Sequence, residues 1–450
     1  MPPTTKPRVL WIDINELFGQ FNLVSHPIGI SRVMLGLADA LIRERGDRFA
    51  EVRLLLWDPV RRRPLWAKPE AFGGTLSAFF PALKRRYENS GWQAQPLRSG
   101  LKKGLISSLP RPLRFAMFPR LNGVTLFLAW ARHTGLQLKP AQFNPGDCLF
   151  APGSFWLGGY APQMAAMARS AGAVVATFAH DVMLLSHPQW TAPHHSEQFR
   201  RGVEGFLPLC SAVICNSENT LQELRAHAGE AVRGETSVCR LADVPDGGIA
   251  AATAAEREDI RDLMKRTYAL FVSTFTPRKN HRLLLLAWQL LWSRLGERTP
   301  WLVLAGGGAP DAATAELLAQ PQSFGHRVVR LTDVSDGDLE MLYRHAWLTV
   351  YPSLGEGYGL PVAEALARGK VCLATTCGGL AEIAPDLVDV IDARDPEMLA
   401  GKLATYLDRP ESLKQKEEAI REKYRPTRWL DSARCVRGIL ERAVATAVPR

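Results

Sequence analysis

The chain has 450 residues, of which 46% are hydrophobic and 22% charged, and its net charge is +10. This length and composition indicate a globular protein with two domains of about 200 residues each and exclude a disordered or fibrous chain. Seven scattered cysteines without a Cys-x-x-Cys pair indicate neither a disulfide framework nor a zinc ribbon. No apolar run is typical of a signal peptide or of a membrane span, so we expect a cytoplasmic protein.

The first half of the chain alternates apolar strands with amphipathic helices. The strand segments are RVLWIDI (8–14), EVRLLLW (51–57), DCLFAP (147–152), AVVATFAHD (173–181) and SAVICNS (211–217). Continuous apolar strands separated by helices predict a parallel sheet that is covered on both faces. The alternation breaks at about 65–145, which we interpret as an irregular, partly helical insertion in an N-terminal domain spanning 1–255.

The insertion is strongly basic. From Asn89 to Gly146 there is no acidic residue, whereas eight cations lie there: Arg98, Lys102, Lys103, Arg111, Arg114, Arg120, Arg132 and Lys139. Apolar residues interleave with these cations, which suits an interfacial segment on anionic lipid better than a nucleic-acid groove. We therefore expect peripheral association with an anionic membrane and no nucleic-acid partner, although a solvated basic insertion explains the composition equally well.

A second alternating series fills the rest of the chain. Its strand segments are ALFVSTF (269–275), WLVLAGGG (301–308), RVVRLT (327–332), WLTVYPS (347–353) and VCLAT (371–375). We place a linker between about 243 and 267, a C-terminal domain at 256–425, and a helix at 426–450 whose apolar face packs back on the N-terminal domain. The fold class is α/β with two facing doubly wound parallel sheets, and ligands are expected at their carboxyl ends, in an interdomain cleft.

The segment YPSLGEGYGLPVAEALARG (351–369) holds the most specific pattern. Pro361 fits the first position of a short helix, and the glycines before it allow backbone N–H groups to approach an anion at the helix N-terminus. Glu356 would repel a phosphate, so a neutral, hydroxyl-rich group such as a sugar fits it better. Glu364, one turn into the helix, suits the vicinal hydroxyls of a ribose. A glycine-capped loop with two solvated glutamates is the alternative.

This segment resembles the E-x(7)-E signature of the family 4 retaining glycosyltransferases, which have two Rossmann-like domains in the GT-B fold. The resemblance implies that Glu356 lies by the donor sugar and that Glu364 holds the nucleotide ribose. It also implies that the backbone between them meets the sugar and the diphosphate, at Gly357, Tyr358, Gly359 and Leu360.

Two further segments of the C-terminal half are similar to the same family. FVSTFTPRKN (271–280) implies that Arg278 and Lys279 lie on the donor diphosphate, with Ser273 and Thr274 in the preceding loop. Ser273 stands where the family usually has glycine, and PRKN alone is more typical of a solvated turn than of a phosphate clamp. LTDVSDGDLEMLYRHA (331–346) implies that Asp333 and Val334 lie near the nucleoside base.

The same helix raises one metal hypothesis. Asp336 and Asp338 match the D-x-D metal pair of the other main glycosyltransferase fold. We reject this interpretation because Ser335 or Asp336 followed by acidic residues and an apolar helix is an ordinary N-cap. No metal and no cofactor are predicted.

Two loops of the N-terminal half complete the resemblance. In GISRV (29–33), Gly29, Ser31 and Arg32 are expected at the donor diphosphate. His180 and Asp181 follow a strand, as in the family's H-D motif, which implies that His180 lies beside the donor sugar or the acceptor hydroxyl and Asp181 on the acceptor side. A satisfied hydrogen bond at the strand end is the alternative for this pair. Ser217 is expected to cap a helix.

The resemblance implies a retaining, metal-independent hexosyltransferase that uses a nucleoside diphosphate sugar. GISRV, HD and PRKN together look most like bacterial mannosyltransferases of surface polysaccharide assembly. This implies GDP-mannose as donor and a polyprenyl-diphosphate-linked or oligosaccharide acceptor at the cytoplasmic face of the inner membrane. The alternatives are a sugar epimerase or phosphorylase on the same fold, and a non-enzymatic protein that binds anionic lipid or nucleic acid.

Overall fold

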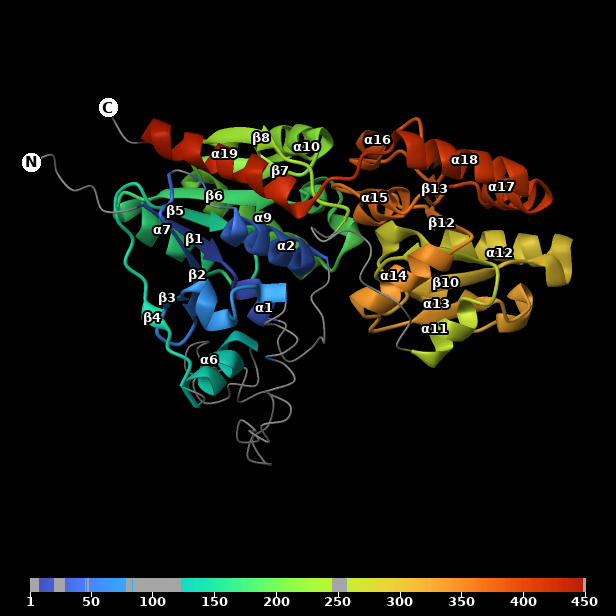
Figure 1. Ribbon diagram of the computed structural model, residues 1–450, viewed down its shortest axis with the longest axis horizontal. Coiled ribbons are helices and arrows are strands. Elements are labelled where there is room, and N and C mark those ends of the chain that lie inside the picture. The colour runs from blue at the N-terminus through green and yellow to red at the C-terminus, as the bar shows by residue number, and fades with distance from the viewer. Residues whose placement is uncertain are drawn as a thin grey trace, which may run out of the picture.

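The computed structural model describes residues 8–19, 29–44, 46, 48–77, 83, 123–133, 135–244 and 257–447. These residues form two lobes that lie side by side, each built around its own sheet (Figure 1). Most of the basic stretch of the predicted insertion and the predicted boundary at 255/256 lie outside the described residues. Within the described part of the chain, no helix combines the length and apolarity that a membrane crossing requires.

The first domain contains an eight-stranded sheet in the order β4-β3-β2-β1-β5-β6-β7-β8. Its strands are β1 (Val9–Asp13), β2 (Glu51–Asp58), β3 (Arg63–Ala67), β4 (Lys139–Pro140), β5 (Cys148–Ala151), β6 (Val174–Ala179), β7 (Ala212–Cys215) and β8 (Glu235–Val238). All pairs are parallel except β2 with β3 and β3 with β4. The predicted parallel sheet is therefore confirmed for β1, β2 and β5 to β8, and the segment interpreted as an irregular insertion adds two antiparallel strands at one edge.

Helices cover both faces of this sheet because successive strand residues point to opposite sides. Leu10 and Ile12 belong to one apolar cluster and Val9 and Trp11 to the other. The helices are α1 (Asn15–Gly19), α2 (Ile30–Arg43), α6 (Gly123–His133), α7 (Ala161–Ser170), α8 (Met183–Ser186), α9 (Pro193–Phe206) and α10 (Glu218–Ala228). Helices α7 and α9 bury apolar residues in the second cluster, whereas α2 and α6 contribute to the first.

The second domain contains a six-stranded sheet in the order β11-β10-β9-β12-β13-β14, with every pair parallel. Its strands are β9 (Tyr268–Val272), β10 (Trp301–Ala305), β11 (Val328–Leu331), β12 (Leu348–Tyr351), β13 (Cys372–Ala374) and β14 (Asp389–Val390). Its helices are α11 (Glu258–Leu263), α12 (His281–Leu295), α13 (Ala312–Leu318), α14 (Asp336–His345), α15 (Leu360–Ala367), α16 (Leu380–Ile383), α17 (Pro396–Asp408) and α18 (Pro410–Lys423). This doubly wound arrangement puts the loops after β9 and β12 at one edge.

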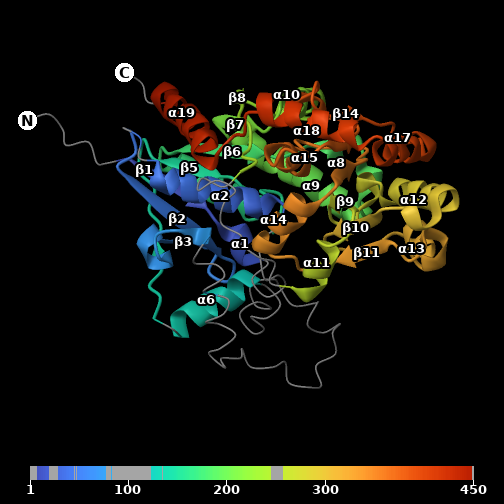
Figure 2. The ribbon, with the colours of Figure 1, turned by 45° about the vertical axis from the view of Figure 1, so that its right-hand side comes forward.

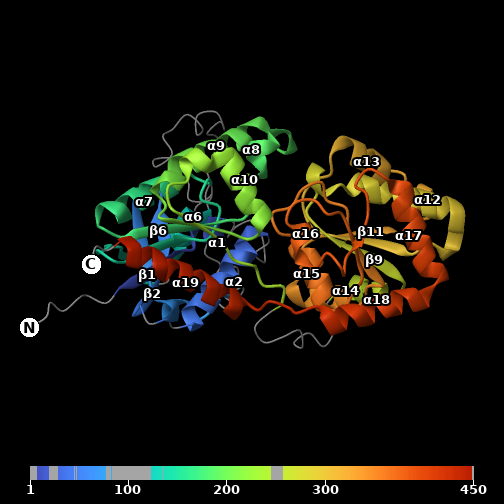
Figure 3. The ribbon, with the colours of Figure 1, turned by 90° about the horizontal axis from the view of Figure 1, so that it is seen from above.

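The last helix, α19 (Trp429–Ala447), lies against the first domain, as the view from above shows (Figure 3). Its Arg437 donates a hydrogen bond to the carbonyl of Leu41 at the end of α2 over 2.6 Å. A side chain at Gly36 of α2 would collide with the ring of Trp429, at 2.4 Å. Helix α19 therefore packs directly on the backbone of α2.

Candidate active site

The loop that follows β12 in the second domain meets the loop that follows β6 in the first domain, where Gly357 lies against the backbone of His180. Helix α14 lies next to α2, since Asp336 of α14 is 3.7 Å from Arg32 of α2 (Figure 2). Glu356 precedes α15 and Glu364 lies within it, and both are nearly buried, at 5% and 4% exposure. Helix α15 begins at Leu360 with Gly359 (φ 103°) as its N-cap, so Pro361 occupies its second position and not the expected first. The short helix fixes the spacing of the two glutamates.

Glu356 lies between two cations of its own domain. Arg278 Nη1 is 3.0 Å from Oε2 and Lys279 Nζ is 2.5 Å from Oε1. Burial alone would raise the pKa of Glu356, but the charges of Lys279 and Arg278 outweigh it and lower the pKa to about 2. The sequence argument placed a neutral sugar beside Glu356 because like charges repel. In the structure, the two cations explain how a buried carboxylate is tolerated here.

Lys279 has a second acceptor in the phenol oxygen of Tyr351, 2.5 Å from Nζ. Burial lowers the pKa of Lys279 to about 8, although the Glu356 carboxylate opposes this shift. Asn280 adopts the left-handed conformation (φ 58°) and its side-chain amide donates to the carbonyls of Pro352 and Ala393. These bonds hold the PRKN turn against the loop that carries Glu356. We call Glu356, Arg278, Lys279 and Tyr351 the Glu356 cluster.

Glu364 is bound from both domains. Arg32 Nη1, on α2 of the first domain, is 2.7 Å from Oε1, and the hydroxyl of Tyr343 donates to Oε2 over 2.9 Å. Arg32 Nε is also 3.7 Å from Asp336. We call Glu364, Arg32 and Tyr343 the Glu364 cluster. The structure thus brings together two residues that sequence reasoning had assigned to neighbouring parts of the donor, Arg32 to the diphosphate and Glu364 to the ribose.

His180 is 5% exposed, and its Nε2 is 2.7 Å from the carbonyl oxygen of Pro152. Because a carbonyl oxygen only accepts, Nε2 carries the proton, and Nδ1 of the neutral ring is an acceptor. Burial lowers the pKa of His180, which favours this neutral form. The side-chain amide of Asn216 donates to the backbone carbonyl of His180 over 2.6 Å. The bond to Pro152 therefore accounts for Nε2 and matches the alternative of a satisfied hydrogen bond at the strand end.

Two glycines of the GEGYG segment, Gly355 and Gly357, face the first domain. A Cβ on Gly357 would lie 2.0 Å from the carbonyl oxygen of His180, and one on Gly355 would lie 2.6 Å from the ring of Trp190. The Ser217 hydroxyl donates to the carbonyl of Gly357 over 2.6 Å. Sequence reasoning assigned these glycines to ligand approach alone, whereas in the structure they also permit close contact between the domains.

The predicted helix caps are confirmed at two places. Ser217 accepts from the N–H of Thr220 at the start of α10. Ser335 likewise accepts from the N–H of Asp338 at the start of α14. The first turn of α14 is therefore an ordinary capped helix start. In the described residues, no group of three or more His, Cys, Asp or Glu side chains is arranged to hold a metal ion.

The GISRV loop differs in detail from the expectation. Gly29 has φ 56° and precedes α2. The Ser31 hydroxyl donates to Glu16 Oε1 over 2.9 Å, and Glu16 Oε2 accepts from the N–H of Ser154 over 2.5 Å. Sequence reasoning missed Glu16, although a carboxylate three residues after a strand was a usable signal. An anionic side chain beside Ser31 makes this loop less positive than the resemblance implied.

Asp13, at the end of β1, was also missed. It accepts from the hydroxyl of Tyr160 over 2.7 Å, and burial raises its pKa to about 6. The remaining expected residues lie in loops at the same edges: Asp181 after β6, Ser273 and Thr274 after β9, Asp333 and Val334 after β11. None of them is a member of the Glu356 cluster or the Glu364 cluster. Tyr358 is 4% exposed and donates to the carbonyl of Leu241 in the first domain.

Two parallel-sheet domains with their carboxyl edges in contact define the GT-B fold, which confirms the expected fold class. The sucrose-phosphate synthase of Thermosynechococcus elongatus superimposes with a TM-score of 0.60 over 98% of this chain and 100% of its own, at 18% sequence identity. At that identity the likeness shows the fold alone.

Residues 253–423, which include the whole six-stranded sheet of the second domain, match the family described as glycosyl transferases group 1. The chain is 35% identical to an O-antigen chain mannosyltransferase B of Escherichia coli over 31% of this chain and 36% of the relative. It is 26% identical to a D-inositol 3-phosphate glycosyltransferase of Corynebacterium glutamicum over 51% of this chain and 57% of the relative. The matches thus span about a third to over half of these relatives' lengths.

Proposed function

We propose that this protein is a retaining glycosyltransferase that moves a sugar from a nucleoside diphosphate sugar to an acceptor hydroxyl. The observation that carries the proposal is the Glu356 cluster, in which one buried carboxylate and two cations lie at the start of a short helix. Fixed cations and helix N–H groups stabilise negative charge that develops on a departing diphosphate. The match of residues 253–423 to a family of glycosyl transferases supports the same reaction class.

Each charged group then has a defined part in the transfer. Arg278 and Lys279 bind the diphosphate as it leaves, and Glu356 orients the sugar and stabilises positive charge at its ring. His180 Nδ1 accepts a hydrogen bond from a sugar hydroxyl. The oxygen of the leaving phosphate takes the acceptor's proton, since acceptor and leaving group share one face in a retaining transfer. Glu364 binds the ribose hydroxyls, and no separate general base is required.

The donor we propose is GDP-mannose, and the acceptor is a lipid-linked or free oligosaccharide of surface polysaccharide assembly. The similarity to an O-antigen mannosyltransferase over 31% of the chain supports the mannose assignment. The basic stretch at 89–146 supports peripheral association with an anionic membrane, where a polyprenyl-linked acceptor would lie.

A panel of nucleoside diphosphate sugars, tested by thermal shift and then by turnover, checks this function. A true donor stabilises the folded state by mass action, by about 2.7 kcal/mol at a hundredfold excess over Kd. GDP-mannose should give the largest rise in Tm and should release GDP only with an oligosaccharide acceptor. Turnover without an acceptor would instead indicate an epimerase, and turnover with inorganic phosphate a phosphorylase. No stabilisation by any nucleotide sugar would contradict the proposal.

A further inference from the structure

Tyr351 is the last residue of β12 and is 2% exposed. Its phenol oxygen lies 2.5 Å from Lys279 Nζ, and the same nitrogen lies 2.5 Å from Glu356 Oε1. The ring of Tyr351 is also 4.9 Å from Nζ, within the range of a cation–π contact. Tyr351 therefore touches the cation of the Glu356 cluster with both its oxygen and its ring.

This contact matters because Lys279 is held in a site that disfavours its charge. The side chain of Lys279 is 10% exposed, and Arg278 competes with it for the single Glu356 carboxylate. An ammonium group has three hydrogens to donate, so the phenol oxygen supplies the second acceptor after Glu356. Burial holds the pKa of Tyr351 well above its usual range, so the phenol stays neutral and adds no charge to the cluster.

We propose that Tyr351 is a positioning residue of the donor site, whose phenol oxygen holds Lys279 beside Glu356 in the protonated form that a diphosphate requires. The inference rests on the proposed function, because it takes Lys279 to bind the donor diphosphate. A hydrogen bond to the charged form of a group favours that form, so loss of the phenol oxygen should let Lys279 lose its proton at lower pH.

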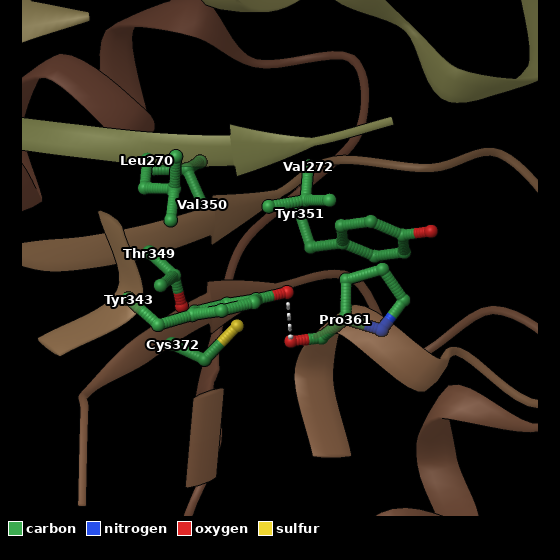
Figure 4. Close-up of a pocket in the computed structure, with 8 residues that line it drawn as sticks. All are labelled: Leu270, Val272, Tyr343, Thr349, Val350, Tyr351, Pro361 and Cys372. Carbon is green, nitrogen blue, oxygen red and sulfur yellow. Dashed lines mark hydrogen bonds between the residues drawn. The ribbon is translucent and has the colours of Figure 1, made fainter. Parts of the chain in front are cut away.

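A second tyrosine provides a matched comparison. Tyr343 and Tyr351 line the same small cavity, which Pro361 also borders (Figure 4). The Tyr343 hydroxyl, however, donates to Glu364 and not to a cation. The two phenols therefore lie near each other but belong to different clusters.

Other titratable groups act on Lys279 and are left in place by the test. Glu356 and Arg278 lie beside it, and Asp181 acts on it from the first domain. His281 on α12 and Cys377 after β13 also interact with its charge. Because Tyr351→Phe changes none of these groups, a shift in the titration of Lys279 reports the loss of the phenol oxygen.

The experiment measures the Lys279 titration in two ways, on wild type, Tyr351→Phe, Tyr343→Phe and Tyr268→Phe. The first is the rate of Lys279 acetylation by acetic anhydride between pH 6.5 and 9.5, read by mass spectrometry without nucleotide. The second is the Kd of GDP, UDP and ADP over the same range by calorimetry. Tyr268→Phe removes a buried hydroxyl that donates to Leu342, outside both clusters, and controls for lost stability.

In wild type, nucleotide affinity should fall as pH rises through about 8, because neutral Lys279 no longer attracts phosphate. In Tyr351→Phe the midpoint of the acetylation curve and the midpoint of the nucleotide-affinity curve should both move down by about half a pH unit to one pH unit. Nucleotide binding at pH 8 should then be about two- to fivefold weaker. Tyr343→Phe should weaken binding equally at every pH, and Tyr268→Phe should match wild type.

Unchanged midpoints in Tyr351→Phe would overturn the inference, as would an equal shift in Tyr343→Phe. If the acetylation midpoint moves but no nucleoside diphosphate binds the wild-type protein, the proposed function fails while the coupling of Tyr351 to Lys279 stands. If nucleotide binds wild type with the expected pH dependence and Tyr351→Phe follows the same curve, the function stands and the role of Tyr351 fails.

Discussion

The two glutamates at either end of segment 356–364 are equally buried but differently held. Glu356 is bound by Arg278 and Lys279, both from its own domain. Glu364 is bound by Tyr343 from its own domain and by Arg32 from the other. The charge of Glu356 is therefore balanced wherever the first domain lies, whereas part of the balance for Glu364 depends on contact between the domains.

The ion pairs Lys279–Glu356 and Arg32–Glu364 also differ in strength, because they differ in exposure to water. Lys279 is almost fully enclosed, so water screens its attraction to Glu356 only weakly. The side chain of Arg32 is 34% exposed, and an ion pair of that kind is worth about 1 kcal/mol or less. Removal of Glu356 should therefore lower the rate of sugar transfer, whereas removal of Glu364 should chiefly weaken the binding of the donor.

Glu356→Gln should have the largest effect. The amide leaves the buried Lys279 and the partly exposed Arg278 without a counter-charge and removes the carboxylate that we propose orients the sugar, so kcat/KM should fall about 10²- to 10³-fold. Breaking a buried ion pair from one side also costs about 3–5 kcal/mol of stability, and Tm should fall accordingly. Steady-state kinetics and thermal unfolding of the same preparation measure both effects.

A matched control separates chemistry from stability in that experiment. Asp389 is a largely buried carboxylate between Lys402 and Lys416, with the Tyr406 hydroxyl as a third partner, on strand β14. Asp389→Asn should lower Tm but keep kcat/KM within about threefold of wild type. If Glu356→Gln loses no more activity than this control, the carboxylate has no part in the transfer.

Gly357→Ala tests whether contact between the domains is needed for activity. The added methyl group would meet the His180 carbonyl, which is backbone and cannot swing away, so the domains must separate at this point. Because a misplacement of about 1 Å can cost 10²-fold in rate, we expect a loss of about 10- to 100-fold in kcat/KM. Small-angle scattering should show a larger radius of gyration.

Gly401→Ala is the control for this substitution, since nothing lies within 4 Å of a Cβ at that exposed position on α17. It should leave activity and scattering unchanged. An active, equally compact Gly357→Ala protein would show that the glycine is not required for the domains to meet.

The fold and the local parts of the site could be predicted from sequence because their signals are local. Alternating strands and helices predicted both sheets, and Ser217 and Ser335 were recognisable as caps from the residues that follow them. Strand β4 was missed because it has only two residues, one of them proline, and pairs with β3 across a long intervening segment. A strand of two residues is too short to show the alternation of apolar and polar side chains that identifies a strand in a sequence.

The contacts between distant residues could not be predicted in this way. Arg32 pairs with Glu364 only because helix α2 of one domain begins beside α15 of the other. Tyr351 was visible in the sequence only as a residue of a buried strand, and its contact with Lys279 depends on how β12 lies beside the PRKN turn. Glu16 was likewise visible, but its bond to Ser31 requires the folded loop.

Glu364→Gln should have the smallest effect of the three and should separate the two glutamates most clearly. The amide still accepts one hydrogen bond from Tyr343 or a ribose but gives up the charge-assisted bonds, so the donor KM should rise about tenfold. The value of kcat should stay within about threefold, because the ribose contact is the same in the ground and transition states.

Arg32→Gln should raise KM by a smaller factor, and 0.5 M salt should reproduce part of that rise in wild type, because a partly exposed ion pair is screened. If Glu364→Gln lowered kcat as much as Glu356→Gln does, the two glutamates would act together in the transfer. Their different partners, two cations for Glu356 and Arg32 with Tyr343 for Glu364, would then not correspond to different roles.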